Sequence, residues 1–320
     1  MAEPRYAELH AHTAFSFLDG ASQPEALAAE AARLGLSALA VTDHDGLYGV
    51  VRFAQAARDL GLGSVFGAEL SMDQSGRATG VPDPQANHLL VLARGPEGYH
   101  RLSRAISEAH LATGEKGEAD YRIDALAALA DGHWLVLTGC RKGAVRRALE
   151  AGGPDAARLA LDRLTALFGR RNVAVEITDN GGPLDSARCD ALAELADAAG
   201  LPLVATGAVH CARPSDGPLA DVLAAVRARS SLDEIDGWLP PGPAHLRSPL
   251  EMAARHARHP RAVATAAALG DECAFDLALV APDLPPCPVP EGHTEATWLR
   301  ELVRRGALER YGPPEAERLS

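Results

Sequence analysis

Short apolar runs alternate with amphipathic stretches along the first two thirds of the chain. The runs are apolar throughout, which is typical of parallel strands covered on both faces, and segments with helical spacing separate them. This pattern predicts an α/β architecture, and seven strand candidates before residue 210 are enough to close a barrel. The predicted strands are the segment just before His10 and residues 37–43, 64–70, 87–93, 133–140, 172–178 and 201–210.

Helices are predicted between the strands at residues 23–35, 49–60, 96–112, 123–130, 143–151, 155–168 and 184–199. The strand pattern stops after residue 210, and only helices are predicted beyond it, at residues 217–229, 248–258, 260–273 and 294–311. A proline-rich stretch at residues 281–292 is typical of a linker. We therefore expect a barrel over residues 1–230, a helical extension over residues 231–284, and a linker with the start of a further region over residues 285–320.

Composition narrows the class of protein. Hydrophobic residues make up 47% of the 320, which is enough for a sizeable core, whereas aromatic residues make up only 4%. A net charge of −12 argues against nucleic-acid binding by phosphate neutralisation alone, although bound cations would supply positive charge locally. The five cysteines form no Cys-x-x-Cys pair, and neither a signal peptide nor a membrane span is evident. We expect a cytoplasmic protein in a reducing compartment, without membrane contact.

Residues that can bind metals gather at the ends of the predicted strands. His10 and His12 lie one residue apart, so their side chains point to the same side of the chain, and Asp19 follows them in a turn. The C-terminal rim of a parallel barrel carries its active site. His, carboxylate and Cys side chains are ligands of Zn²⁺ and related ions, and their number here predicts a cluster suited to phosphoester hydrolysis. The other candidates are His44, Glu69, Cys140 and His210 at strand ends, and His88 at the beginning of its strand.

Each candidate has a simpler interpretation when taken alone. A histidine at a strand end is commonly an ordinary polar residue, Cys140 could be a small buried apolar residue, and Glu69 could pair with an arginine. Their joint occurrence at successive strand ends favours a site. Arg141 and Lys142, beside Cys140, are candidates for binding a phosphate-containing substrate, with a solvated helix start as the alternative.

Several motifs of the chain resemble the PHP (polymerase and histidinol phosphatase) domain, in the version at the N-terminus of bacterial C-family DNA polymerases, which are polymerase III alpha-like. Other segments point to the error-prone, translesion branch of that family. The PHP motifs are His10-x-His12-Thr, residues 17–21, Thr42-Asp43-His44, Gly67-Ala68-Glu69, His88, residues 138–140 and His210. The segments typical of the error-prone branch are residues 15–21, 94–99, 110–117, 138–143, 244–248 and 292–299.

The resemblance implies a distorted seven-stranded (βα) barrel with a helical C-terminal extension and up to three divalent metal sites, with zinc or manganese as the expected ions. The family's ligands, carried over by position, are His10, His12 and Glu69 for the first metal; Glu69, His88 and Cys140 for the second; and Asp19, His44 and His210 for the third. The implied partners are DNA, the remainder of a polymerase chain, and accessory translesion and sliding-clamp proteins.

Two departures from the family pattern limit the expected activity. The last motif is normally Asp-x-His, but here it is Ala208-Val209-His210, so the first metal loses a ligand. In addition, no Asp-x-Asp motif of a polymerase palm follows Pro285, so this chain by itself lacks the carboxylates of nucleotidyl transfer. We expect the N-terminal portion of an error-prone DNA polymerase in DNA repair and damage tolerance, with weak or absent 3′–5′ exonuclease or phosphoesterase activity.

Two alternatives stay open at this stage. One is a free-standing PHP phosphoesterase that acts on a small phosphomonoester, and the other is a metal-free interaction module. The polymerase-like segments after residue 230 favour the hypothesis of a DNA polymerase region over the free-standing phosphoesterase, because a small-molecule phosphatase does not need them.

Overall fold

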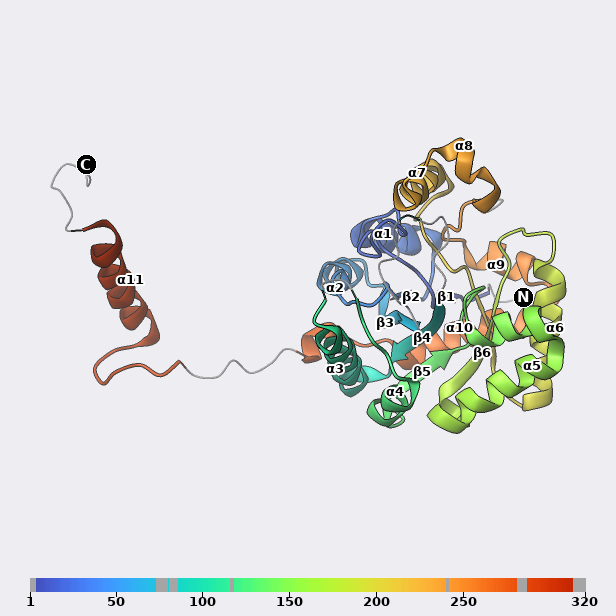
Figure 1. Cartoon of the computed structure of the whole chain (residues 1–320), viewed down its shortest axis with the longest axis horizontal. Helices are drawn as coiled ribbons and strands as arrows, with labels where there is room; N and C mark the ends of the chain where they lie inside the picture. The colour runs from blue at the N-terminus through green and yellow to red at the C-terminus, as the bar shows by residue number, and fades with distance from the viewer. Residues whose placement is uncertain are drawn as a thin grey trace. The chain divides into compact units, whose positions relative to one another are not determined.

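The computed structural model describes residues 4–72, 80, 86–115, 118–239, 242–280 and 287–312. The chain divides into two compact units, Met1–Val280 and Ala281–Ser320 (Figure 1). The boundary predicted at residue 230 is not tested by this division and stays a prediction. Of the segment predicted at residues 285–320, positions 285, 286 and 313–320 lie outside the described residues.

Seven strands lie side by side in chain order in the first unit, with the helices around them (Figure 1). The strands are β1 (Ala7–Glu8), β2 (Ala38–Val41), β3 (Gly63–Met72), β4 (Asn87–Ala93), β5 (Trp134–Leu137), β6 (Val173–Thr178) and β7 (Leu203–Thr206). Just beyond β1 and β7, Ala11 bridges Val209, and the amides of His12 and Val209 each donate a hydrogen bond of 2.8 Å across this seam. The sheet therefore forms the nearly closed barrel that the sequence predicts.

The prediction that all strands are parallel is wrong at β4. This strand runs antiparallel to both β3 and β5, whereas the other neighbouring strands are parallel. A parallel pair needs a crossover connection, usually a helix. No helical segment is predicted between residues 70 and 87, so the missing helix was the available signal of the reversal.

The helices that follow β1 and the later strands are α1 (Pro24–Leu34), α2 (Val50–Asp59), α3 (Gly95–Thr113), α4 (Ile123–Ala130), α5 (Ala144–Phe168) and α6 (Asp185–Ala199). The element α5 contains the two helices predicted within residues 143–168, which meet at a non-helical kink where Gly153 has φ 75° and precedes Pro154. Proline removes a helical donor and glycine relaxes the backbone, so the kink has a local cause. After β7 come α7 (Gly217–Ala228), α8 (Leu232–Ile235), α9 (Pro249–Arg255) and α10 (Pro260–Cys273).

Helix α10 completes the barrel core. A Cβ atom at Gly270 would lie 2.5 Å from the Cβ of Ala7 and 3.5 Å from that of Ala38, so the missing side chain lets the helix approach the first residues of β1 and β2. Ala262, Ala266 and Gly270 on this helix are buried in the same core. Helix α10 therefore supports the end of the barrel opposite to the strand ends that carry the candidate ligands.

The second unit contains α11 (Glu295–Tyr311), which begins at the predicted place. The Thr294 hydroxyl caps it by accepting a hydrogen bond of 3.3 Å from the Thr297 amide. In the described part of the chain, no helix combines the length and the apolar character that crossing a bilayer requires.

Candidate metal centre

The predicted ligands converge at one rim of the barrel. His10 and His12 follow β1, His44 follows β2, Cys140 follows β5 and His210 follows β7. Glu69 lies within β3 and forms an isolated parallel β-bridge with His44. His88 is near the start of β4, and because β4 is antiparallel to its neighbours, its start lies at the rim where the parallel strands end. The reversed direction of β4 therefore explains why His88 lies at the start of its strand, whereas the other candidates lie at strand ends.

Glu69 is the centre of the cluster. Its carboxylate is buried, and Oε1 lies 3.2 Å from His88 Nδ1, 3.6 Å from His10 Nε2 and 4.0 Å from Cys140 Sγ. Its Oε2 lies 3.3 Å from His12 Nε2 and 3.7 Å from His44 Nε2. One carboxylate thus reaches five other candidate side chains, which is the placement of a bridging group.

One side of the cluster is open to solvent, and we name it the Asp19 corner (Asp19, His44, His210 and Arg227). Asp19 Oδ2 lies 3.0 Å from His210 Nδ1 and 3.4 Å from His44 Nε2. The Arg227 guanidinium, from α7, donates to Asp19 Oδ1 at 2.8 Å and to the Leu18 carbonyl at 2.9 Å. The side chains of His210 and Asp19 are 31% and 20% exposed, so small molecules can approach this corner.

The other side is closed, and we name it the His10 corner (His10, His12, Glu176 and Ala208). Ala208 is included because the amide of the next residue, Val209, donates a hydrogen bond of 2.8 Å to the His10 carbonyl. The side chains of His10 and His12 are 0% and 1% exposed, and their Nε2 atoms lie 3.1 Å apart. The His12 ring stacks between the rings of His44 and His210, with centroid distances of 4.6 and 4.7 Å. His12 therefore connects the two corners.

Asp43 holds the loop between His12 and Asp19. Its carboxylate accepts hydrogen bonds from the Thr13 amide at 2.6 Å, the Thr13 hydroxyl at 2.8 Å and the Ser16 hydroxyl at 2.7 Å. The Ser16 oxygen in turn accepts from the His44 amide at 3.1 Å and lies 3.3 Å from His12 Nδ1. These contacts fix the two histidines relative to each other. Asp43 belongs to a motif quoted for the family resemblance, but its positioning role was not predicted.

Sequence reasoning also missed Glu176. This residue lies in the middle of β6, is buried, and places Oε1 2.8 Å from His10 Nδ1. The available signal was a single carboxylate within the otherwise apolar strand Val173–Thr178, where an unpaired charge would be costly.

Charges in the cluster strongly shift its titration when no cation is present. Burial alone would raise the pKa of Glu69, but the His88 and His10 imidazoles outweigh it and hold the pKa well below the usual value. Burial opposes protonation of His44, yet Asp19 and Glu69 raise its pKa to about 9. Burial, with His44 and His210 nearby, lowers the pKa of His12 to about 3. His12 is therefore neutral at physiological pH, as a ligand must be, whereas His44 must lose a proton to bind a metal.

The residues present fit divalent cations. Three groups of side chains each place one ligand atom apiece within 4.8 Å of one another: His10, Glu69 and Cys140; His12, His44 and Glu69; His12, Asp19 and His210. Asp19 Oδ2 and His88 Nδ1 are buried without a hydrogen bond to any described residue, although other candidate ligand atoms lie 3.0 and 3.2 Å away. Lone-pair atoms that approach so closely without hydrogen bonding are arranged as a shared cation would arrange them. His88 enters no three-residue group, so the division of ligands among three metals stays a prediction.

Ala208 leaves a gap in the donor set. It is buried, and its φ of 44° lies in the left-handed region, where Asp and Asn are several-fold more common than alanine. The backbone at this position therefore suits the aspartate of the family motif, while the side chain present cannot bind a cation.

The two predicted substrate-binding residues flank the cluster. Arg141 is exposed and Lys142 is half-buried, and both follow Cys140 directly. The Lys142 carbonyl accepts a hydrogen bond of 2.9 Å from the His88 amide, so this loop runs beside β4, the strand that contains His88. Nothing in the geometry tests contact with a substrate, and their role stays a prediction.

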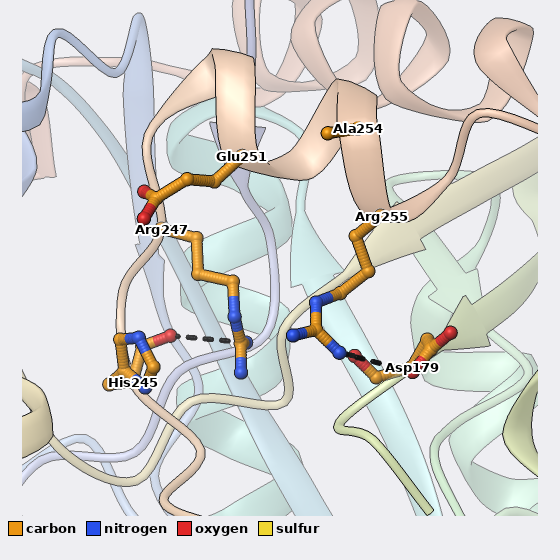
Figure 2. Close-up of a pocket in the computed structure, with 6 residues that line it drawn as sticks. All are labelled: Asp179, His245, Arg247, Glu251, Ala254 and Arg255. Atoms are coloured by element: carbon orange, nitrogen blue, oxygen red, sulfur yellow. Dashed lines mark hydrogen bonds and ion pairs between the residues drawn. The ribbon is translucent and has the colours of Figure 1, made fainter.

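A pocket of about 590 Å³ is lined in part by His245, which follows Ala244 in the chain. The His210 amide donates a hydrogen bond of 2.8 Å to the Ala244 carbonyl, so the pocket lies near the chain segment of His210. Its lining residues are Asp179, His245, Arg247, Glu251, Ala254 and Arg255 (Figure 2). Arg255 contacts Asp179 at 3.2 Å, and Arg247 donates to Asn180 at 3.1 Å. The lining contains two arginines and two carboxylates, Asp179 and Glu251, so the pocket lacks the surplus of positive charge that a phosphate site needs.

Comparison with known proteins relates the chain to polymerases. It is 60% identical over 311 residues to the error-prone DNA polymerase of Mycolicibacterium paratuberculosis and 61% identical over 312 residues to that of Mycobacterium tuberculosis. Each alignment covers 97% of this chain but only 28% of the relative, so the chain spans little more than a quarter of the length of these polymerases. Among solved structures, an amidohydrolase from Chromobacterium violaceum aligns with 64% of this chain and 88% of its own, at 17% identity and a TM-score of 0.42.

The family assignment comes from the barrel half of the chain. The PHP domain matches residues 8–180, a range that begins just before His10 and includes every candidate ligand except His210. The three groups of possible metal ligands lie within this range, apart from His210. This chain belongs to the PHP domain family.

Proposed function

We propose that this chain is the metal-binding PHP region of an error-prone DNA polymerase that acts in translesion synthesis, and that its own 3′–5′ exonuclease activity is weak or absent. The similarity to error-prone polymerases over 97% of the chain supports the polymerase context. DNA, the rest of the polymerase chain, and accessory translesion and sliding-clamp proteins are the proposed partners. The polymerase activity itself would reside in the part of the relatives that this chain does not span.

The observation that carries the proposal is the convergence of candidate ligands on Glu69. Five side chains place a nitrogen or sulfur atom within 4.0 Å of its carboxylate. Zinc and manganese are the proposed ions, because imidazole, carboxylate and thiolate form a ligand set for first-row metals. When bound, such ions polarise a phosphate ester and activate water for its hydrolysis.

The chain's own residues set how far such chemistry can go. The open Asp19 corner is where a phosphate ester would enter, and Arg227 lies there with its guanidinium on Asp19. At the closed His10 corner, Ala208 removes a carboxylate that would help to hold the first cation. We therefore infer that metals here mainly stabilise the PHP region and that hydrolysis is inefficient.

Metal analysis of the purified chain tests the metal centre. We expect at least one equivalent of a divalent metal to remain after dialysis, and the His88→Gln variant to retain less. His256→Gln is the matched control, because this histidine is also buried (2% exposed, against 9% for His88) but lies outside the cluster. Less than one equivalent in all three proteins would favour the metal-free interaction module instead.

A nuclease assay tests the activity. We expect a 3′-labelled mismatched primer to stay largely intact with the wild-type chain in zinc or manganese. Metal-dependent degradation of this primer would contradict the inferred inefficiency. Rapid hydrolysis of a small phosphomonoester, with the primer left intact, would favour a free-standing phosphoesterase over the polymerase context.

A further inference from the structure

Glu176 is a buried carboxylate that forms no ion pair with a lysine or an arginine among the described residues. It is 1% exposed, and among the described residues its single ion-pair partner is His10. Burying a carboxylate is costly unless its charge is compensated, so a position in the centre of a barrel strand calls for a physical reason. That reason is to be sought in the groups that contact the carboxylate.

The contacts of Glu176 tie three strands to the His10 imidazole. Its Oε1 accepts hydrogen bonds from His10 Nδ1–H at 2.8 Å and from the Thr206 hydroxyl on β7. Its own amide donates to the hydroxyl of Thr138, just after β5, at 2.9 Å. Its Oε2 has no hydrogen bond to any described residue. The carboxylate thus retains charge that its hydrogen bonds do not fully satisfy, immediately behind the imidazole.

This arrangement determines which nitrogen of His10 faces the cluster. A carboxylate only accepts hydrogen bonds, so Nδ1 must carry the proton. The Nε2 atom then faces His12 Nε2 at 3.1 Å and Glu69 Oε1 at 3.6 Å, with its lone pair available once that nitrogen is deprotonated. A carboxylate on the far nitrogen of a metal-binding histidine fixes the ring orientation and increases the basicity of the ligand.

We propose that Glu176 is the positioning residue of the His10 corner, because it holds His10 with Nε2 toward Glu69. Its negative charge, on the far side of the His10 ring, would partly replace the charge of the carboxylate that is missing at Ala208. The inference rests on the proposed metal-binding function. The corner has lost a ligand at Ala208 but keeps a carboxylate within hydrogen-bond distance of its first histidine. Its affinity for a cation therefore depends strongly on that carboxylate.

Metal titration of the full chain tests the role of Glu176. For Glu176→Gln we expect binding of one equivalent of Zn²⁺ or Co²⁺ to weaken by about 10–100-fold, the usual cost of losing such a partner, with the remaining equivalents nearly unchanged. Thr206→Val, which removes the hydroxyl but keeps the carboxylate, should have a smaller effect in the same direction. Glu30→Gln is the control, because Glu30 is also buried and paired but lies on α1 with Arg33 and Arg213.

A second measurement does not need metal. Nitrogen-15 NMR of the histidines in the metal-free wild type should show His10 with a protonated, hydrogen-bonded Nδ1, and this signal should shift in Glu176→Gln. If Glu176→Gln does not fold, Thr206→Val still has to weaken binding and move the His10 signal.

The possible failures are distinguishable. Equal binding by wild type and Glu176→Gln, or an equal loss in Glu30→Gln, would overturn the role of Glu176 and leave the metal centre intact. Absence of metal binding in the wild type would overturn the proposed function first. Wild-type His10 with an unprotonated Nδ1 would contradict the positioning role whatever the metal content.

Discussion

The two corners of the cluster share Glu69 and His12 but differ in how the protein surrounds them. At the His10 corner the ligand candidates are fully buried and are held from behind by Glu176. At the Asp19 corner the candidate ligands Asp19, His44 and His210 are 20–31% exposed, and the supporting group is the cation of Arg227 rather than a carboxylate. One corner is built into the barrel interior, and the other opens toward solvent.

This difference indicates a division of roles. A buried corner can bind a cation only with the charges that the fold supplies, because water cannot replace a missing ligand as easily there. An exposed corner can complete its coordination with water or substrate, as catalytic metal sites do. The loss of an acidic ligand at Ala208 therefore falls where it is hardest to replace, and the predictions below are ordered from the largest expected effect to the smallest.

Removing Glu69 should weaken both metals for which it is a predicted ligand. We expect Glu69→Gln to lower the affinity of these two equivalents by more than about 100-fold, because a shared ligand should matter more than an outer partner, which costs about 10–100-fold. Titration with Zn²⁺ measures this loss, and the Glu30→Gln variant serves as the control. Unchanged affinity of all equivalents would show that the cluster binds metals independently of Glu69.

Restoring a carboxylate at position 208 should make the His10 corner resemble an intact site. We expect Ala208→Asp to fold, since the left-handed φ of 44° suits aspartate, and to bind one equivalent about 10–100-fold more tightly. The same variant should degrade a 3′-labelled mismatched primer that the wild type leaves intact. Ala208→Asn, with the same backbone preference but no charge, is the matched control. Tighter binding without degradation would show that activity is limited elsewhere.

The metal-free corners should respond differently to pH. Burial lowers the pKa of His44, but Asp19 and Glu69 outweigh this effect and raise the pKa to about 9. The protonated form of His44 therefore stabilises the fold. Since the folded pKa lies above the unfolded value of about 6.5, this stabilisation is complete below pH 6.5 and is lost as pH rises through 9.

The stability gap between wild type and His44→Gln should therefore shrink by about 1.5 kcal/mol from pH 6.5 to pH 8 in urea unfolding with a chelator present. His12 has the opposite sign, because its pKa is lowered to about 3 and it therefore favours unfolding as pH falls below 6.5. His12→Gln should lose less stability than the wild type between pH 7 and pH 5. A parallel response of the two variants would refute the contrast between the corners.

The sequence by itself determined the strands, most of the helices and the set of candidate ligands. Strand and helix periodicities are local properties, so apolar runs such as those around residues 38–41 and 173–178 can be read without knowing their neighbours. The gap at Ala208 was visible only through the resemblance to the PHP domain, whose last motif is normally Asp-x-His. These features need no information about distant parts of the chain.

Only the tertiary structure decided which side chains meet. The reversed direction of β4 depends on pairing with β3 and β5, and it brings His88 to the rim despite its position at the start of a strand. Glu176 is 166 residues from His10, and one carboxylate in an apolar strand does not reveal its partner. The packing of Gly270 against Ala7 likewise joins the helical extension to the first strand. Such contacts arise from register and burial across the whole barrel, which local patterns do not encode.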